Sequence, residues 1–164
     1  MRAEIERAMP QAHRRLSEIA HAAKRHWGYP EAWMREWRDT LTITPEFIAD
    51  NAVYAASVGD EIVGFYALLG SGAKVTLDHL WVLPSQMGAG IGRELFNHAI
   101  ATARRRGAIE VEIEADPNAA AFYERMGATR VGENVYELEG QPRRLPLMIY
   151  RIEGEPKSNE GGHR

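Results

Sequence analysis

Residues 74–106 read KVTLDHLWVLPSQMGAGIGRELFNHAIATARRR and decide the fold, because they place a strand, a glycine-rich turn and a helix in direct succession. Residues 74–83 are apolar on both faces, which predicts a strand inside a sheet that ends at Pro84. Residues 91–106 carry an apolar stripe at helical spacing and stop at Gly107. The turn between them therefore lies at a helix N-terminus, where free backbone N–H groups and the helix dipole favour a bound anion such as phosphate.

The spacing of the glycines narrows the kind of phosphate ligand. A Walker A loop needs Lys-Ser or Lys-Thr after its last glycine, whereas Gly92 is followed by Arg93 and Glu94. The turn has the form Gly-x-Gly-x-Gly from Gly88 through Gly90 to Gly92, which differs from the Gly-x-Gly-x-x-Gly of a dinucleotide-binding fold. ATP and dinucleotides are disfavoured, and from spacing alone a loop without a ligand stays open.

The rest of the chain alternates between helical and extended patterns. Helices are predicted over residues 10–25, 31–40 and 116–126, with a further short helical turn capped by Thr44. Strands are predicted over residues 2–7, 52–58, 61–70, 109–115, 128–138 and 144–152, with turns at Gly59-Asp60 and Gly140-Gln141-Pro142. The pattern predicts one α+β domain over residues 1–153, with a mixed, mostly antiparallel central sheet of about six or seven strands flanked by helices, and a disordered tail over residues 154–164.

Composition excludes several classes of function. The 164 residues carry a net charge of −3 with scattered basic residues, so nucleic acid is not expected as a partner. The chain has no cysteine and its six histidines lack ligand spacing, so we predict no disulfide and no metal site. No run approaches the roughly 18 apolar residues of a membrane span. We expect a cytoplasmic protein without a membrane partner, and the sequence leaves a homodimer open.

Residues 77–100, LDHLWVLPSQMGAGIGRELFNHAI, resemble the pyrophosphate-binding motif of the GNAT superfamily of N-acetyltransferases. Gly90 and Gly92 match its two small positions, and Met87 stands where the family carries Arg or Gln. The resemblance implies the GNAT-like acyl-coenzyme A N-acyltransferase fold, splayed in the middle of the sheet, with acetyl-coenzyme A as cosubstrate. The turn residues that it assigns to the cofactor are Met87, Gly88, Ala89, Gly90, Ile91, Gly92 and Arg93.

A second stretch, residues 115–133 or ADPNAAAFYERMGATRVGE, resembles the later motif of the same family. Ala119, Tyr123 and Gly127 match, and the resemblance as a whole extends over residues 52–152. It assigns cofactor contacts to Asn118, Phe122 and Tyr123. Asp116 stands where the family often has Asn, so whether Asp116 or Asn118 contacts the pantetheine stays open.

The family's reaction is direct transfer, in which the acceptor amine attacks the thioester within a ternary complex. The resemblance implies a primary amine of a small molecule or peptide as acceptor, and it makes Tyr123 the general acid for the departing thiolate. A backbone N–H near Leu80, Trp81 or Val82 would polarise the thioester carbonyl. A noncatalytic acyl-coenzyme A sensor or interaction module on the same fold is the alternative.

An attacking amine must lose a proton, and Asp78 and His79 are the candidate acceptors. Strict alternation places them on opposite faces of the strand, with Trp81 on the face of Val75 and Leu77. Because the strand is predicted to be buried, each polar side chain either functions in the reaction or pairs with a polar neighbour. Both interpretations stay open.

The N-terminal helical third contains a group of aromatic residues, in the region that usually covers the acceptor in this superfamily. Aromatic rings attract amines through cation–π contact. We therefore assign acceptor binding to Trp27, Tyr29 and Trp33, with core packing as the alternative for at least two of the three tryptophans Trp27, Trp33 and Trp37.

Overall fold

A computed structural model describes residues 2–152, which form one seven-stranded sheet in the order β1-β2-β3-β4-β5-β7-β6. The strands are β1 Glu4–Arg7, β2 Ala52–Val58, β3 Glu61–Leu69, β4 Lys74–Val82, β5 Glu110–Glu114, β6 Thr129–Leu138 and β7 Gln141–Arg151. All neighbouring pairs are antiparallel except β4 and β5, which are parallel. The predicted mixed, mostly antiparallel sheet flanked by helices is confirmed.

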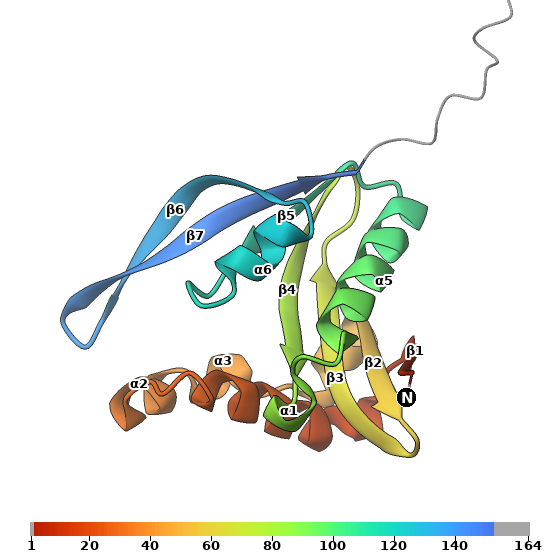
Figure 1. The fold of residues 1–164 in the computed structure, drawn as a ribbon, viewed down its shortest axis with the longest axis horizontal. Coiled ribbons are helices and arrows are strands. Elements are labelled where there is room, and N and C mark those ends of the chain that lie inside the picture. The colour runs from red at the N-terminus through yellow and green to blue at the C-terminus, as the bar shows by residue number, and fades with distance from the viewer. Residues whose placement is uncertain (1, 153–164) are drawn as a thin grey trace, which may run out of the picture.

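Helices cover both faces of the sheet (Figure 1). The helices are α1 His13–Arg25, α2 Glu31–Glu36, α3 Arg38–Leu41, α4 Pro45–Asp50, α5 Ile91–Arg105 and α6 Ala120–Arg125. Helices α1 to α4 bury one apolar cluster against the sheet, with Leu16 and Ile19 of α1 packed on Phe65 of β3. Helices α5 and α6 bury the second cluster on the opposite face, where Leu95 and Phe96 are fully buried. None of the helices in this part of the chain is long and apolar enough to cross a membrane.

The two parallel strands at the centre of the sheet pair over only three residues each. Lys74 to Thr76 of β4 pair with Glu110 to Glu112 of β5, whereas β4 continues to Val82 without this partner. A β-bulge interrupts the pairing of β4 with β3 two residues further on, at Asp78. Beyond that point β4 and the hairpin of β6 and β7 run in different directions (Figure 1), and the sheet opens as predicted.

The bulge corrects the predicted faces of β4. An extra residue in one strand reverses the alternation beyond it. Val75 and Leu77 belong to the cluster under α5, and Leu80 packs against that same cluster. Trp81 packs instead against the cluster under the N-terminal helices. The prediction that Trp81 shares the face of Val75 and Leu77 is therefore wrong, because it assumed unbroken alternation.

Most element boundaries agree with the sequence prediction, and three differ. The predicted helix over 31–40 is divided at Trp37, whose φ of −90° and ψ of 0° interrupt regular helix. The helix predicted from residue 116 begins only at Ala120, because the Asp116 carboxylate accepts a hydrogen bond from the Asn118 backbone N–H and holds an Asx turn. The last hairpin turns at residues 139–140, before the predicted position.

The predicted N-cap of α4 is confirmed, since the Thr44 hydroxyl accepts the Phe47 N–H at 3.0 Å. Such a cap stabilises a helix by about 1 kcal/mol. The tail predicted over residues 154–164 lies outside the described residues.

Candidate active site

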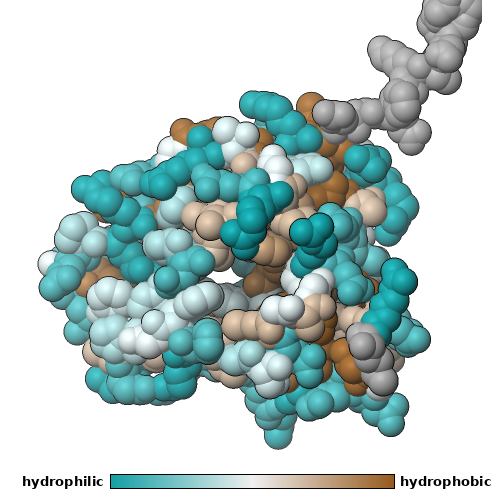
Figure 2. All heavy atoms as spheres, in the orientation of Figure 1, coloured by the Kyte–Doolittle hydropathy of each residue, from teal (hydrophilic) through white to brown (hydrophobic). Residues whose placement is uncertain are grey.

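A cavity of about 700 Å³ lies where β4, the glycine turn and α6 meet. The surface has a hollow at this place (Figure 2). Helix α6 and the β6–β7 hairpin lie on one side of it, and the N-terminal helices lie on the other. We call this space the first cavity. Most of the predicted cofactor-binding residues line it, namely Leu80, Trp81, Val82, Met87, Gly88, Gly90, Gly92, Arg93, Asn118, Phe122 and Tyr123.

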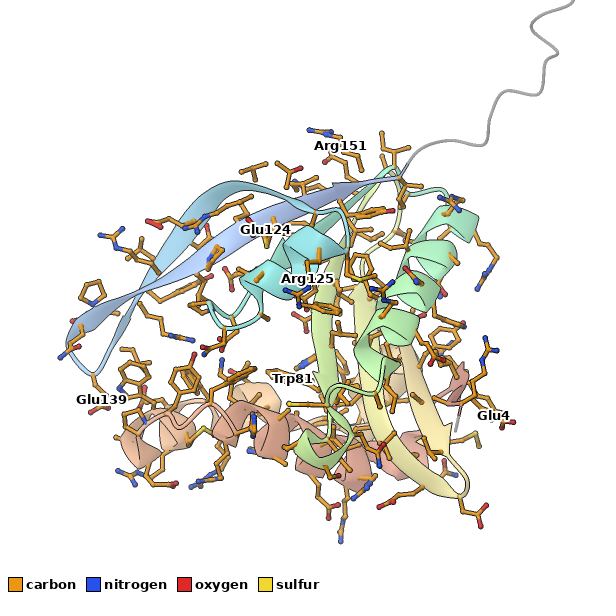
Figure 3. All side chains as sticks on the ribbon, in the orientation of Figure 1. Glu4, Trp81, Glu124, Arg125, Glu139 and Arg151 are labelled. Atoms are coloured by element: carbon orange, nitrogen blue, oxygen red, sulfur yellow. The ribbon has the colours of Figure 1, made fainter. Side chains whose placement is uncertain are left out.

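Two predicted cofactor residues do not line this cavity with their side chains. Ala89 is exposed in the turn, and the Ile91 side chain is only 3% exposed because it packs in the core under α5. Both still contribute backbone to the turn. Polar lining residues to which the sequence analysis gave no cofactor role include Gln86 and Arg125, and Arg125 extends from α6 (Figure 3).

The glycine turn presents unpaired backbone donors to the first cavity. Gly88 and Gly90 have φ values of +86° and +87°, a conformation that only glycine adopts without strain. The first helical hydrogen bond of α5 runs from Glu94 N–H to Gly90 C=O at 3.1 Å. Within the described residues no backbone carbonyl accepts the N–H groups of the three preceding residues, 91–93. The turn therefore presents free backbone donors at a helix N-terminus, an arrangement that suits an anion.

Strand β4 adds two more free donors at the wall of this cavity. The Leu83 N–H donates to Val63 of β3 at 2.8 Å, so alternation directs the Trp81 N–H toward β3 as well. The N–H groups of Leu80 and Val82 then point to the opposite edge, where β5 has diverged. Of the three predicted oxyanion donors, the geometry favours Leu80 and Val82.

Tyr123 lies on α6 between the core and the first cavity. Its side chain is buried, and burial followed by the nearby Asp116 charge raises the pKa of its phenol. Within residues 2–152 the Tyr123 hydroxyl makes no hydrogen bond. In this part of the chain every side-chain oxygen that is fully sealed from solvent has a hydrogen-bond partner, so the Tyr123 hydroxyl is not fully sealed. The hydroxyl therefore opens onto the cavity that Tyr123 lines, and it stays protonated at physiological pH.

A smaller space of about 230 Å³, the second cavity, lies on the other side of Trp81. Trp81 and Asp116 line both cavities, so the two spaces share a wall. Trp81 projects from β4 near the N-terminal helices (Figure 3). The other side chains around the second cavity are Lys24, Trp37, Thr40, Leu41, Thr76, Leu77, Asp78, His79, Glu114, Arg143 and Leu145.

Asp78 and His79 meet at the second cavity instead of lying on opposite faces. The Asp78 Oδ2 atom is 3.4 Å from the His79 Nε2 atom, because the bulge at Asp78 brings both side chains to one side. The prediction that Asp78 and His79 lie on opposite faces is wrong because, like the prediction for Trp81, it assumed a strand without a bulge. The Asp78 side chain is 39% exposed and that of His79 only 7%, so the carboxylate is the accessible group.

The protonation state of His79 follows from its partners. The indole Nε1–H of Trp81 can only donate, and it donates to His79 Nδ1 at 2.9 Å. Burial lowers the pKa of His79 although Asp78 opposes the shift, so the ring is neutral near pH 7. A neutral ring with Nδ1 as acceptor carries its proton on Nε2, which faces Asp78. His79 therefore orients Asp78, and its own lone pair is engaged by Trp81.

Sequence reasoning missed a buried ionic cluster between the cavities. The Asp116 carboxylate receives Lys24 Nζ at 2.6 Å and lies 3.4 Å from Arg143 Nη2. Burial acts to raise the pKa of Asp116, but the charge of Lys24 and the hydrogen bonds outweigh it, so the pKa is lowered. The Tyr29 hydroxyl donates to the same carboxylate at 3.0 Å, and Asn118 Nδ2 donates to the Tyr29 oxygen. We call Lys24, Asp116 and Arg143 the ionic cluster.

The predicted acceptor-binding aromatics separate in space. Trp27 lines the first cavity, whereas Tyr29 and Trp33 line neither cavity. The Arg143 guanidinium lies over the Tyr29 and Trp33 rings, at 4.9 and 5.7 Å from their centroids. The aromatic residues at the second cavity are Trp37 and Trp81. The assignment of Trp27, Tyr29 and Trp33 to the acceptor stays a prediction.

Comparison with known proteins supplies relatives for this arrangement. A protein named 5-NmdU N-acetyltransferase, from Pseudomonas phage PaMx11, is 24% identical over 134 residues, which cover 80% of this chain and 90% of the relative. The GCN5-related N-acetyltransferase from Rhodopseudomonas palustris superposes with a TM-score of 0.78 at 20% identity, covering 93% of this chain and 97% of its own. The PaiA N-acetyltransferase of Thermoplasma acidophilum, solved with coenzyme A, superposes with a TM-score of 0.68 at 17% identity. The match covers 93% of this chain and 100% of the PaiA chain.

These structural similarities show a shared fold. The sequence model of the acetyltransferase (GNAT) family matches residues 14–128, well over half of the chain. The glycine turn, strand β4 and Tyr123 all fall within that match. The chain belongs to the acetyltransferase (GNAT) family, as its two motifs predicted.

Proposed function

We propose that this protein transfers the acetyl group of acetyl-coenzyme A to a primary amine of a small molecule or peptide, by direct attack in a ternary complex. One observation carries the proposal: the free donors of the glycine turn and Tyr123 line one cavity, and a second cavity, which shares Trp81 and Asp116 with the first as lining residues, holds the partly exposed Asp78 carboxylate. Donor and acceptor would then occupy different cavities with a common wall.

The residues of the first cavity fit the donor. The free N–H groups of residues 91–93 and the dipole of α5 suit a pyrophosphate, and the cations of Arg93 and Arg125 line the same space. Phe122 lies over the turn, since a Cβ built on Gly92 would be 3.6 Å from its ring. Acetyl-coenzyme A supplies the acetyl thioester. Solved neighbours bound to coenzyme A support this donor.

The backbone of β4 stabilises the charge that develops on the thioester carbonyl oxygen. The Leu80 and Val82 N–H groups face the opening of the sheet, where no strand competes for them. A fixed donor of this kind contributes about 10²–10³ in rate. Because the donors are backbone groups, the identity of these two side chains matters little to this step.

Two side chains handle the protons. As the new N–C bond forms, the amine proton passes to Asp78, directly or through water, while the neutral His79 ring holds this carboxylate in place. As the C–S bond breaks, the Tyr123 hydroxyl donates its proton toward the departing sulfur. The raised pKa of Tyr123 keeps that proton available at neutral pH.

The alternative is a noncatalytic acyl-coenzyme A sensor on the same fold. Release of free thiol from acetyl-coenzyme A, followed across a panel of amines, amino acids, polyamines and peptides, separates the two. We expect at least one acceptor to increase the rate of release well above hydrolysis. Binding of coenzyme A with no acceptor-stimulated release across the panel would favour the sensor.

A further inference from the structure

The ionic cluster buries two cations around a single carboxylate. The side chains of Lys24, Asp116 and Arg143 are 11%, 9% and 12% exposed. They come from α1, from the connection between β5 and α6, and from β7. One carboxylate cannot neutralise two cations, so the cluster carries an excess positive charge in a poorly hydrated place. Such a charge is costly unless a further anion accompanies it.

Both cations line the second cavity and retain unused donors. Lys24 Nζ has three protons and makes one hydrogen bond, to Asp116, within the described residues. Arg143 uses only its Nη2 atom there, toward Tyr29 and Asp116. No side-chain nitrogen in this part of the chain is both sealed from solvent and unpartnered. The Nε and Nη1 atoms of Arg143, which have no partner within the described residues, are therefore open to solvent, and Lys24 Nζ keeps two protons for a further acceptor.

Aromatic rings fix the direction of the two cations. Lys24 Nζ lies 4.2 Å from the Trp37 ring centroid, and the Arg143 guanidinium carbon lies 5.0 Å from the same centroid. Cation–π contacts of this length hold the cations beside the second cavity without neutralising them. Burial lowers the pKa of Lys24, and the charge and hydrogen bond of Asp116 only partly oppose this shift within the cluster. A ligand anion would complete it.

We propose that the acceptor is a small amine that also carries an anionic group, a carboxylate or a phosphate, which binds Lys24 and Arg143 while its amine faces Asp78. This inference rests on the proposed function and names its substrate class. Side chains of both charges line the second cavity, with Lys24 and Arg143 for the anion and the partly exposed Asp78 carboxylate for the amine. Its volume of about 230 Å³ suits a small molecule.

Acetylation rates of matched amines test the proposal. Two amines are anionic: β-alanine carries a carboxylate and O-phosphoethanolamine carries a phosphate monoester. Their neutral matches are β-alaninamide and methoxyethylamine, respectively. Putrescine is the cationic amine. Rates are corrected for the fraction of unprotonated amine. Because the anion gains charged hydrogen bonds to Lys24 and Arg143, we expect kcat/KM for at least one anionic amine to exceed that of its neutral match by about tenfold or more. Equal or better transfer to neutral or cationic amines would overturn the proposal.

Arg143→Gln should abolish this preference by raising KM for the anionic amine, with KM for acetyl-coenzyme A unchanged. Arg143→Lys should restore part of it. Arg144→Gln is the matched control, because Arg144 is 61% exposed on the same strand and pairs with Glu133. An unchanged preference in Arg143→Gln would contradict the proposal.

A binding measurement makes the anion site testable without turnover. Quenching of tryptophan fluorescence by propanoate and by methyl phosphate, which lack an amine, reports on Trp37 beside the two cations. We expect saturable binding that weakens about tenfold in Arg143→Gln and is unaltered in Arg144→Gln. If no amine is acetylated but this binding is found, the proposed function fails and the anion site stands. Absence of saturable binding in the wild type would remove the anion site.

Discussion

At the scale of single residues, Tyr123 carries the most specific expectation. Replacing Tyr123 by Phe removes one hydroxyl and leaves the ring that packs on Phe96 and Phe122. Loss of a general acid lowers turnover by about 10²–10⁴. We therefore expect Tyr123→Phe to reduce kcat in that range while KM for acetyl-coenzyme A changes little. Tyr54→Phe, on β2 and outside both cavities, is the control, and steady-state kinetics showing equal kcat for the two variants would exclude the acid role.

The pH dependence of the reaction tests whether Asp78 accepts the amine proton. Asp78→Asn keeps the shape of the side chain but cannot accept the amine proton, so kcat/KM for the amine should fall by about 10²-fold near neutral pH. The loss should shrink at higher pH, where more amine is already unprotonated. Glu112→Gln is the control, because Glu112 pairs with Lys74 and lines neither cavity. A pH-independent loss would indicate a structural role for Asp78.

The ionic cluster shows why some residues were not predictable. Tyr123 could be found because a local motif contains it. Lys24 and Asp116 are 92 residues apart in the chain, and Arg143 is a further 27 residues on. No local pattern links them, since their proximity depends on how α1 and β7 pack around the opened sheet. The sequence showed the adjacent aromatic residues. It did not show that the protein's own cations would lie on their rings.

At the scale of elements, the glycine turn predicts a separation between binding and stability. Gly90 has a φ of +87° at the start of α5, and a side chain there costs about 1–2 kcal/mol. Gly90→Ala should therefore distort the donors of the turn and weaken coenzyme A binding by about tenfold, measured by calorimetry. Gly72 has a φ of +90° in the β3–β4 connection, with open space around it. Gly72→Ala should cost similar stability and leave the affinity unaltered; equal affinities in both variants would contradict the role of the turn.

Strand β4 marks the limit of pattern reasoning at this scale. Its approximate range and its place inside the sheet followed from the apolar run, and so did the helix after it. The bulge did not, because an extra residue is specified by pairing with β3 and leaves no mark in the sequence of β4 itself. That one residue determines which side Asp78, His79 and Trp81 face, and hence which cavity each of them lines.

At the scale of the whole molecule, Asp116 joins the N-terminal helices to the C-terminal hairpin. Asp116→Asn leaves two buried cations without a counterion, which should lower the free energy of unfolding by about 3 kcal/mol. The expected fall in Tm is about 10 °C. Thermal unfolding followed by circular dichroism measures it, with Asp60→Asn in the exposed β2–β3 turn as control. A fall no larger than that of the control would show that the cluster does not support the fold.

Acid should reveal the same contribution. The pKa of Asp116 is lowered in the folded state, so its stabilisation is complete above the unfolded pKa of about 4 and is lost as the pH falls through the folded value. Wild-type stability should therefore drop below about pH 4 more steeply than that of Asp116→Asn. Parallel curves for the two proteins in denaturant titrations across this range would argue against the assignment.

In direct transfer the acetyl group passes from the thioester to the amine without an acetylated protein between them. A single-turnover reaction with isotope-labelled acetyl-coenzyme A, analysed by mass spectrometry of both the small molecules and the intact protein, tests it most directly. We expect label to appear on the amine at a rate that depends on amine concentration, with no acetylated protein formed on the way. Bound coenzyme A with no label on any amine, or label that reaches the amine only after it has accumulated on the protein, would contradict it.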